Sequence, residues 1–502
     1  MLATSLTAAV LGVDAHLVRV ETDTAAGFPK FTMVGLPDSA VKESEGRIRA
    51  ALRNCGYGFK WDRRITVNLS PASLRKVGSS YDLATAVGLL AADGAVPAAR
   101  LSRLLLVGEL ALDGSVRPVA GVLPMMLMAR RQGMAAAFVP AGNLGEASIV
   151  EGIEAHAVGS LTEAVALAMV ERRPPPPPRP AIPQGRSPGP DLAEIRGQLL
   201  ARRALEIAAA GGHNLLLFGP PGSGKTMLAR RLPGILPPLT SEEAVETTAI
   251  HSAAALPLDS IVTTRPFRSP HHTASDASLV GGGAFPRPGE VSLAHNGVLF
   301  LDEIPEFRRH VLEALRQPLE EGWVTVSRVR ASVRLPARFQ LVAAMNPCPC
   351  GGDGGACRCT PRQALAYRSR LSGPLLDRID LHVEVPALSY AEVTGPPGEP
   401  SRSVASRVAA ARQRQAARSR ATGALTNARL EPSAARSVAA LDGEGDRLLA
   451  AAAGRYRLSG RVIDRLLRVA RTIADLEGYP SVTARHVAEA LHFRRCGVDT
   501  NG

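Results

Sequence analysis

The chain has 502 residues, a hydrophobic content of 45% and a formal net charge of +13 at pH 7. This length allows two or three domains with separate cores, and six cysteines in so long a chain exclude a disulfide-rich scaffold. No uninterrupted apolar run is long enough to cross a membrane, and the first eighteen residues lack the basic start of a signal peptide. We therefore expect a cytoplasmic protein. Its positive charge favours a nucleic-acid partner, unless the many arginines are simply spread evenly over the surface.

Residues 1–170 predict an α/β domain. Apolar, strand-like runs alternate with helical patterns, which are clearest at residues 41–55 and 81–92. Residues 108–116 contain Asp113-Gly114 between apolar runs, which predicts a hairpin. Residues 171–190 are rich in proline, and consecutive prolines adopt extended polyproline II. They predict a linker between domains, with a spacer favoured over a docking ligand.

A phosphate-binding loop follows an apolar strand at residues 214–218. The loop fits G-x-x-x-x-G-K-[ST] and consists of Gly219, Pro220, Pro221, Gly222, Ser223, Gly224, Lys225 and Thr226. Its backbone N–H groups and the start of the next helix would cradle the phosphates of ATP or GTP, with Lys225 at the β- and γ-phosphates and Thr226 on Mg²⁺. Lys225 is the only lysine after residue 76, in a chain that otherwise uses arginine. We expect Pro233 to interrupt the following helix.

Two later strands end in polar residues suited to ATP hydrolysis. The apolar run 297–301 ends in Asp302 and Glu303. There Asp302 would hold Mg²⁺ through water and Glu303 would polarise the attacking water. The apolar run 339–345 ends at Asn346, which would orient the same water from a strand lying between the other two. The alternative for an isolated Asp-Glu pair is a solvated strand end.

Several further motifs of the chain resemble those of a known protein family. Residues 267–273, 281–283, 288–296 and 346–351 resemble magnesium-chelatase-like AAA+ ATPases of the YifB/ComM family, and the resemblance covers nearly the whole chain. It implies an AAA+ P-loop α/β core with a helix-two insert at residues 191–395 and a C-terminal helical lid at residues 396–502. It also implies a ring, expected to be a hexamer. The best-understood relatives act as DNA helicases that drive branch migration during recombination and transformation.

The same resemblance suggests roles for three arginines. Arg378 resembles the arginine finger that reaches the γ-phosphate in a neighbouring subunit, and Arg370 is the second candidate. Arg461, on a predicted helix at residues 458–468, resembles the lid arginine called sensor 2. Each of them has a solvated helix face as its alternative.

The N-terminal region resembles the proteolytic domain of Lon-type proteases, which has the ribosomal-protein-S5-like fold. The resemblance rests on residues 76–80, 108–110 and 119–123, and Ser80 falls near the nucleophile position. Leu123 occupies the position of the catalytic lysine in that family. A serine without a base is a weak nucleophile, so we expect a domain that does not cleave peptides.

Two basic segments are candidate contacts for single-stranded or branched DNA. In the helix-two-insert branch of AAA+ proteins, the insert and a following hairpin point into the central pore. The insert contributes Arg268, His271 and His272. Residues 322–334 alternate like a hairpin and contribute Arg328, Arg330 and Arg334. The two histidines could instead pack within the insert.

Four clustered cysteines form a candidate zinc site. Their spacing is C-x-C-x6-C-x-C, at Cys348, Cys350, Cys357 and Cys359. Four thiolates can bind Zn²⁺ tetrahedrally, although C-x-x-C is the commoner spacing. A redox pair or unliganded cysteines are the alternatives.

The sequence favours an ATP- and Mg²⁺-dependent ring motor that acts on DNA. Three rivals remain open. A magnesium-chelatase motor would require a porphyrin and partner subunits, a protein-remodelling ATPase would respond to unfolded protein rather than to DNA, and a peptidase would depend on Ser80.

Overall fold

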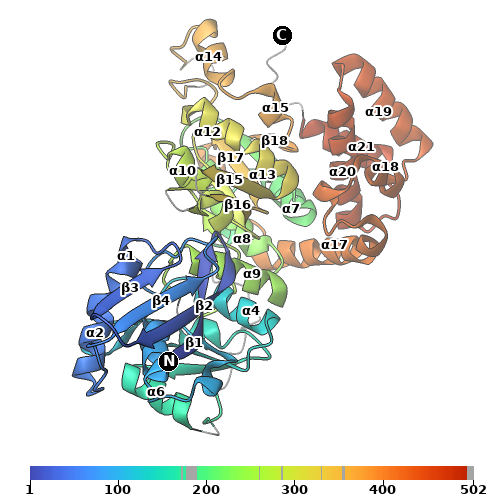
Figure 1. Cartoon of the computed structure of the whole chain (residues 1–502). Coiled ribbons are helices and arrows are strands. Elements are labelled where there is room, and N and C mark those ends of the chain that lie inside the picture. The colour runs from blue at the N-terminus through green and yellow to red at the C-terminus, as the bar shows by residue number, and fades with distance from the viewer. Residues whose placement is uncertain are drawn as a thin grey trace.

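The computed structural model describes residues 1–170, 173–176, 189–258, 260–283, 286–328, 331–352 and 357–494. Most of the predicted linker, residues 171–190, and Arg330 lie outside these ranges. The described chain forms an N-terminal region built on a mixed sheet, a central region built on a parallel sheet, and a helical C-terminal region (Figure 1). The α/β fold class predicted from the sequence is therefore confirmed. No described helix combines the length and the apolar character needed to span a membrane.

In the described N-terminal region, seven strands form one sheet in the order β3-β4-β2-β1-β5-β8-β9. Their bounds are β1 Leu2–Leu11, β2 Asp14–Ala25, β3 Lys30–Val34, β4 Arg64–Ser70, β5 Leu104–Leu106, β8 Ala136–Pro140 and β9 Glu154–Val158. The helices α2 (Ser44–Asn54), α3 (Asp82–Ala92) and α6 (Leu161–Met169) share one apolar core with the sheet. The helices α4 (Val122–Arg131) and α5 (Leu144–Ala147) share a second one. The short helix α1 spans Ser39–Lys42.

The predicted hairpin is confirmed between β6 (Glu109–Leu110) and β7 (Val116–Arg117), which pair antiparallel. Its turn requires Gly114, whose φ of +87° is a backbone conformation that L side chains rarely adopt.

The central sheet is parallel, with the described strand order β11-β14-β17-β10-β18. These strands span Phe267–Arg268, Val298–Leu301, Gln340–Met345, Leu215–Phe218 and Leu381–Glu384. The residues of β10, β14 and β17 are buried throughout, because helices cover both faces of a parallel sheet. The helices α7 (Leu199–Gly211) and α8 (Lys225–Ile235) belong to the core on one face. The helix α12 (Arg309–Ala314) belongs to the core on the other.

The expectation that Pro233 interrupts the helix after the phosphate-binding loop is wrong. Helix α8 continues through Pro233 to Ile235. The proline lies near the end of the helix, so it removes only one late backbone hydrogen bond. Leu232 and Ile235 are fully buried in the core on either side of it, and this packing keeps the last turn in place.

Two excursions leave the central sheet. Between β10 and β14 the chain forms α9 (Ser241–Ala253), α10 (Asp276–Leu279), α11 (Glu290–Leu293) and the small strands β12 (Gly281–Gly282) and β13 (Arg287–Pro288). After α13 (Arg316–Glu321), β15 (Trp323–Arg328) and β16 (Ala331–Pro336) pair antiparallel, which confirms the predicted hairpin. Helices α14 (Pro361–Arg368), α15 (Gly373–Leu376) and α16 (Tyr390–Thr394) follow β17 and flank β18.

The C-terminal region is helical, as predicted. It contains α17 (Ser401–Thr422), α18 (Pro432–Ala439), α19 (Gly443–Tyr456), α20 (Gly460–Glu477) and α21 (Ala484–His492). Buried residues of these helices belong to the same apolar core as α7 and α8. The helical region therefore packs directly against the helices that cover one face of the central sheet.

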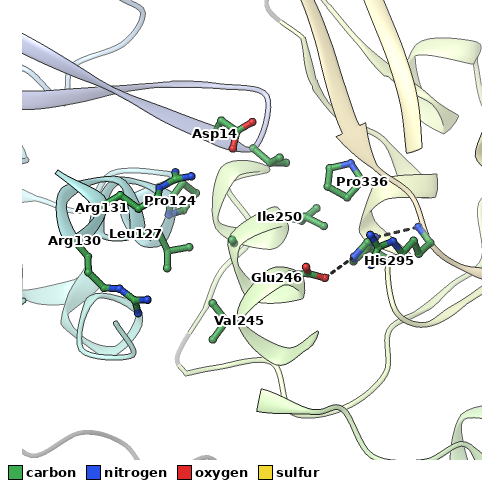
Figure 2. Close-up of a pocket in the computed structure, with 13 residues that line it drawn as sticks. Asp14, Pro124, Leu127, Arg130, Arg131, Val245, Glu246, Ile250, His295 and Pro336 are labelled. Carbon is green, nitrogen blue, oxygen red and sulfur yellow. Dashed lines mark hydrogen bonds and ion pairs between the residues drawn. The ribbon is translucent and has the colours of Figure 1, made fainter. Parts of the chain in front are cut away.

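The N-terminal region docks on the central region through α4 and α9. Figure 2 shows these two helices facing each other across a cavity, with Leu127 on one side and Ile250 on the other. The volume of the cavity is about 420 Å³. Beside the cavity, the backbone N–H of Gly121 donates to the carbonyl oxygen of Ser252 at 3.0 Å. A second contact lies at the β1–β2 turn, where a Cβ added to Gly12 would stand 2.3 Å from Val333 of the hairpin. The two regions are therefore closely packed.

Candidate nucleotide site

The phosphate-binding loop connects β10 to α8 in the way the sequence predicts. Gly222 and Gly224 adopt φ angles of +76° and +94°, which side chains disfavour. Gly219 has a different reason to be glycine, because an added Cβ would lie 2.0 Å from the carbonyl oxygen of Val385. The loop is thus held tightly against the end of the sheet, with α8 beginning at Lys225.

The ammonium group of Lys225 is enclosed by three acceptors. Its Nζ donates to the carbonyl oxygens of Gly219 and Pro220 at 2.6 and 2.8 Å, and to Oδ1 of Asn346 at 3.1 Å. Burial lowers the pKa of Lys225, while the carboxylates of Asp302 and Glu303 oppose that shift. The geometry holds a cation at the mouth of a loop of backbone N–H groups, which is what a polyphosphate requires.

The side-chain oxygens of Thr226 and Asp302 lie together. The hydroxyl of Thr226 donates to Oδ2 of Asp302 at 2.8 Å. Hydroxyl and carboxylate oxygens suit the hard cation Mg²⁺, so both residues fit the predicted metal role. Glu303 has a φ of +48°, and its backbone N–H donates to Oδ1 of Asp302 at 3.0 Å. The side chain of Glu303 is 53% exposed, which leaves it accessible to water.

Asn346 reaches this group because of the strand order. Strand β17 lies between β14 and β10, and parallel strands end at the same edge of the sheet. The residues that follow these three strands therefore meet at one edge, as the sequence predicted for Asn346.

A cavity next to the loop was not predicted. It measures about 610 Å³, a size typical of small-molecule sites. Its apolar lining includes Ile195, Met227, Leu388 and Val393. Gln198 lies at its edge and donates from Nε2 to the carbonyl oxygens of Ser223 and Pro386 at 3.2 and 2.7 Å. The sequence did not indicate this cavity, because residues at the phosphate-binding loop are joined there by residues 193–198 and 388–397, which are almost two hundred positions apart and carry no motif.

The structure places the three candidate arginines differently. Arg378 is 6% exposed and forms an ion pair with Glu320. Arg370 is 53% exposed and pairs with Glu306 at 2.9 Å. Arg461 is exposed in the first turn of α20, and its side chain forms no hydrogen bond or ion pair with any residue that the structure describes. In the isolated chain, Arg378 is thus enclosed, whereas Arg370 and Arg461 are presented to solvent.

The candidate DNA residues of the insert are engaged within the chain. The guanidinium of Arg268 donates to both carboxylate oxygens of Glu290, at 2.6 and 2.8 Å. The ring of His271 lies 4.1 Å from that of His272. Nδ1 of His272 lies 4.0 Å from Oε2 of Glu303, a proximity to the predicted catalytic carboxylate that the sequence did not indicate.

On the hairpin, Arg334 is exposed and its guanidinium lies 3.4 Å from the centre of the Trp323 ring. Such a contact holds the cation at the surface without neutralising it. Arg328 is the last residue of β15.

The four cysteines lie together beside the phosphate-binding loop. All four sulfurs are within 4.8 Å of one another. The Cys348 Sγ atom lies 3.3 Å from that of Cys350 and 3.5 Å from that of Cys357. Four thiolates bound to one Zn²⁺ are about 3.8 Å apart, so this cluster fits the metal. The same segment contacts the loop, because a Cβ on Gly351 would lie 2.5 Å from Cγ of Pro221.

The region that resembles a protease offers no base at the expected position. Ser80 is 8% exposed, and Leu123 is fully buried in the apolar core. Lys76 is also fully buried, and its ammonium donates to the carbonyl oxygens of Gly35 and Pro71.

Family models match the chain in three segments. Residues 191–393 match magnesium chelatase, subunit ChlI; residues 20–143 match subunit ChlI of Mg-chelatase; and residues 398–494 match the C-terminal part of that subunit. These matches, with the parallel sheet and its phosphate-binding loop, define a magnesium-chelatase-like AAA+ protein.

Curated relatives extend the similarity to the whole chain. Protein YifB of Escherichia coli is 46% identical over 492 residues, which cover 97% of this chain and 96% of the relative. Competence protein ComM of Haemophilus influenzae is 44% identical over 494 residues, with the same coverage of both chains. The magnesium-chelatase 38 kDa subunit of Cereibacter sphaeroides is 27% identical over only 212 residues, or 39% of this chain and 58% of the relative. The chain belongs to the YifB/ComM family of magnesium-chelatase-like AAA+ proteins.

Proposed function

We propose that this protein is a ring-forming ATPase that uses ATP and Mg²⁺ to move along or remodel DNA. One observation carries the ATPase: Lys225, Thr226 and Asp302 meet at one edge of a parallel sheet, where Asn346 joins them. The cavity of about 610 Å³ beside the loop would receive the base. Lys225 would hold the β- and γ-phosphates, and Thr226 and Asp302 would hold Mg²⁺.

Glu303 is the residue we assign to the attacking water. Its carboxylate is exposed next to the magnesium ligands, and its backbone N–H is fixed by Asp302. A carboxylate in that position accepts a proton as the water attacks the γ-phosphate. Asn346 would orient the same water. Mg²⁺ held by Thr226 and Asp302 would supply positive charge to offset the negative charge that develops on the phosphate oxygens.

We propose that arginines at the contacts between subunits complete the nucleotide sites of a ring. Family resemblance supports Arg378 as the finger that completes the neighbouring site, which requires that its pair with Glu320 open on assembly. Arg370 is the alternative, because it is already exposed. Arg461 would act from the lid. A hexamer is the expected ring.

We propose that one Zn²⁺ ion is bound by four cysteine ligands, Cys348, Cys350, Cys357 and Cys359. The metal would tie the segment after Asn346 into a compact clip. Because Gly351 lies against Pro221, that clip would support the phosphate-binding loop from outside.

DNA is the substrate we propose for the motor, with branch migration in recombination as its activity. The exposed Arg334 on the hairpin and the net charge of +13 support it. A relative that is 44% identical is named a competence protein, which also favours work on DNA. The chelatase alternative has weaker support, since the chelatase relatives align with only 39% of this chain. Protein remodelling remains the second candidate.

The test is steady-state ATP hydrolysis by the purified chain, with and without single-stranded DNA and four-way-junction DNA, and with Glu303→Gln as the inactive control. We expect DNA to stimulate hydrolysis in the wild type and the variant to remain inactive. If hydrolysis requires Glu303 but no DNA stimulates it, the proposed ATPase activity stands and the proposed action on DNA is rejected. Stimulation by unfolded protein would then favour remodelling.

A further inference from the structure

Aromatic residues and lysines are scarce in this chain, but both gather in one short segment of the N-terminal region. Aromatic residues make up 4% of the sequence, and there are two tryptophans. The stretch 28–61 nevertheless contains Phe28, Phe31, Tyr57, Phe59 and Trp61, together with Lys30, Lys42 and Lys60. This concentration has no part in the nucleotide site, so it calls for a separate explanation.

The topology brings two loops of this segment to the same end of the sheet. Lys30 begins β3 and Arg64 begins β4, and these residues are register partners in parallel strands. Ala25 ends β2 and is also paired with Arg64. A Cβ on Gly27 would lie 3.8 Å from Cβ of Arg64, so the loop before β3 lies directly on the start of β4. Both strands lie in the part of the N-terminal region that faces away from α18–α21 (Figure 1).

Three of the aromatic rings, those of Phe31, Phe59 and Trp61, form a cluster. The ring of Trp61 lies 4.9 Å from that of Phe59 and 6.4 Å from that of Phe31. Phe59 is 8% exposed and anchors the cluster in the core. Phe28 is 86% exposed, more than any other large hydrophobic residue in the described ranges. Phe28 lies three residues before Phe31 in the chain, and its exposed ring offers a face on which another flat group can stack.

One arginine lies over this cluster, and further cations lie in the loops and strand ends that follow and precede it. The guanidinium of Arg49 lies 4.5 Å from the centre of the Trp61 ring. Lys30, Lys60 and Arg64 are exposed, and their side chains form no hydrogen bond or ion pair with any described residue. Of the nearby acidic residues, Glu45 is paired with Arg49 at 3.4 Å and Asp62 is exposed. The surface is therefore net basic, and we call Phe28, Lys30, Arg49, Trp61 and Arg64 the aromatic–basic edge.

We propose that the aromatic–basic edge binds single-stranded nucleic acid. Bases stack on exposed rings, and phosphates bind unpaired lysines and arginines. A duplex hides the faces of its bases, so the exposed Phe28 ring selects an unpaired strand. Phe28 receives a base, while Lys30 and Arg64 receive the flanking phosphates. The inference extends the proposed action on DNA, because it gives the strand a second contact outside the central region.

The two tryptophans supply a direct readout. Trp61 belongs to the aromatic–basic edge, Trp323 belongs to the hairpin, and each has an arginine over its ring. In the full-length variant Trp323→Phe, tryptophan emission comes from Trp61 alone. In Trp61→Phe it comes from Trp323 alone. We expect oligothymidylate to quench the emission of Trp61 in the first variant, with a midpoint that matches binding measured by fluorescence anisotropy.

A set of substitutions tests the assignment by affinity. The triple variant Phe28→Ala, Lys30→Ala and Arg64→Ala should bind oligothymidylate about 10-fold more weakly than the wild type, because it loses one stacked base and two phosphate contacts. Its salt dependence, the slope of log K against log salt concentration, should be shallower by about 1.4, the value for two lost contacts on a single strand. Basal ATP hydrolysis should be unchanged.

Two controls match the substitutions. Lys42→Ala removes an exposed lysine beyond the opposite end of β3, and Tyr390→Ala removes an aromatic side chain that is 84% exposed in the central region. Both should bind oligothymidylate like the wild type.

The remaining outcomes overturn the inference in distinguishable ways. If the protein binds oligothymidylate and Trp323 responds, but Trp61 does not and the triple variant binds normally, the aromatic–basic edge makes no DNA contact and the proposed motor stands. If the triple variant changes only the state of self-association, the edge is a contact between copies of the chain. If the wild type binds no nucleic acid at all, both this inference and the proposed action on DNA are rejected.

Discussion

The phosphate-binding loop and the hairpin each present a cation, but they hold it in opposite ways. Lys225 is 8% exposed and is fixed by three acceptors within 3.1 Å. Arg334 is exposed and rests on the ring of Trp323 at 3.4 Å. The first arrangement is preorganised for one small ligand, whereas the second remains open to a long one.

This difference has a physical consequence. A preorganised and partly desolvated cation interacts strongly with a phosphate, so its removal is nearly all-or-none. An exposed cation interacts through solvent and is screened by salt, so its removal has a graded effect. The nucleotide site and the hairpin should therefore respond very differently to substitution.

Removing the cation of the loop should have the largest effect. We expect Lys225→Ala to lower kcat/KM for ATP by about 100-fold or more, as expected for the loss of a charged donor in a closed site. Fluorescent ATP binding and steady-state hydrolysis measure it. Lys42→Ala, at an exposed lysine, is the control and should behave like the wild type. Retention of hydrolysis in Lys225→Ala would reject the loop as the nucleotide site.

Substitution of the proposed base should separate hydrolysis from binding. Glu303→Gln should lower kcat by about 100-fold or more, the usual contribution of a general base, while ATP still binds. Single-turnover hydrolysis and an ATP-binding titration measure the two effects. Glu242→Gln changes an exposed acid of α9 and should have no effect. Equal losses of binding and hydrolysis would contradict the role of Glu303.

Loss of the zinc clip should have an intermediate effect. We expect metal analysis to find one zinc ion per chain in the wild type and none in Cys357→Ser. The variant should also bind ATP severalfold more weakly, because Gly351 packs on Pro221 of the phosphate-binding loop. Cys55→Ser, at a cysteine remote from the cluster, should keep its zinc. A wild-type chain without zinc would leave the cluster as free thiols and refute the clip.

A smaller effect is expected at His272. Its contact with Glu303 is 4.0 Å long and partly exposed, so His272→Ala should lower kcat only about threefold without changing ATP affinity. His271→Ala is the matched control, because His271 hydrogen-bonds to Thr273 instead. If both variants lose only DNA affinity, the histidines contact DNA and do not position Glu303.

The sequence predicted those parts of the molecule that depend on local patterns. The phosphate-binding loop, the two carboxylates after β14 and the hairpin predicted over residues 322–334 are all encoded in short stretches. Even Asn346 could be anticipated, because parallel strands bring their ends to one edge.

Contacts between distant segments could not be predicted in this way. The 610 Å³ cavity joins residues 193–198 to residues 388–397, and no motif marks either segment. Arg378 forms an ion pair with Glu320, and Arg268 forms one with Glu290. The sequence did not indicate either ion pair. The continuation of α8 past Pro233 depends on apolar packing that surrounds its last turn.

The most direct test of the contrast between the enclosed and the exposed cation is the DNA-concentration dependence of ATP hydrolysis in Arg334→Ala. Arg447→Ala, at an exposed arginine of α19 that has no partner among the described residues, is the control. The account predicts unchanged hydrolysis without DNA, a severalfold higher half-saturating DNA concentration in Arg334→Ala only, and a weaker salt dependence of stimulation. Loss of basal hydrolysis in that variant, or stimulation identical to the wild type, would contradict it.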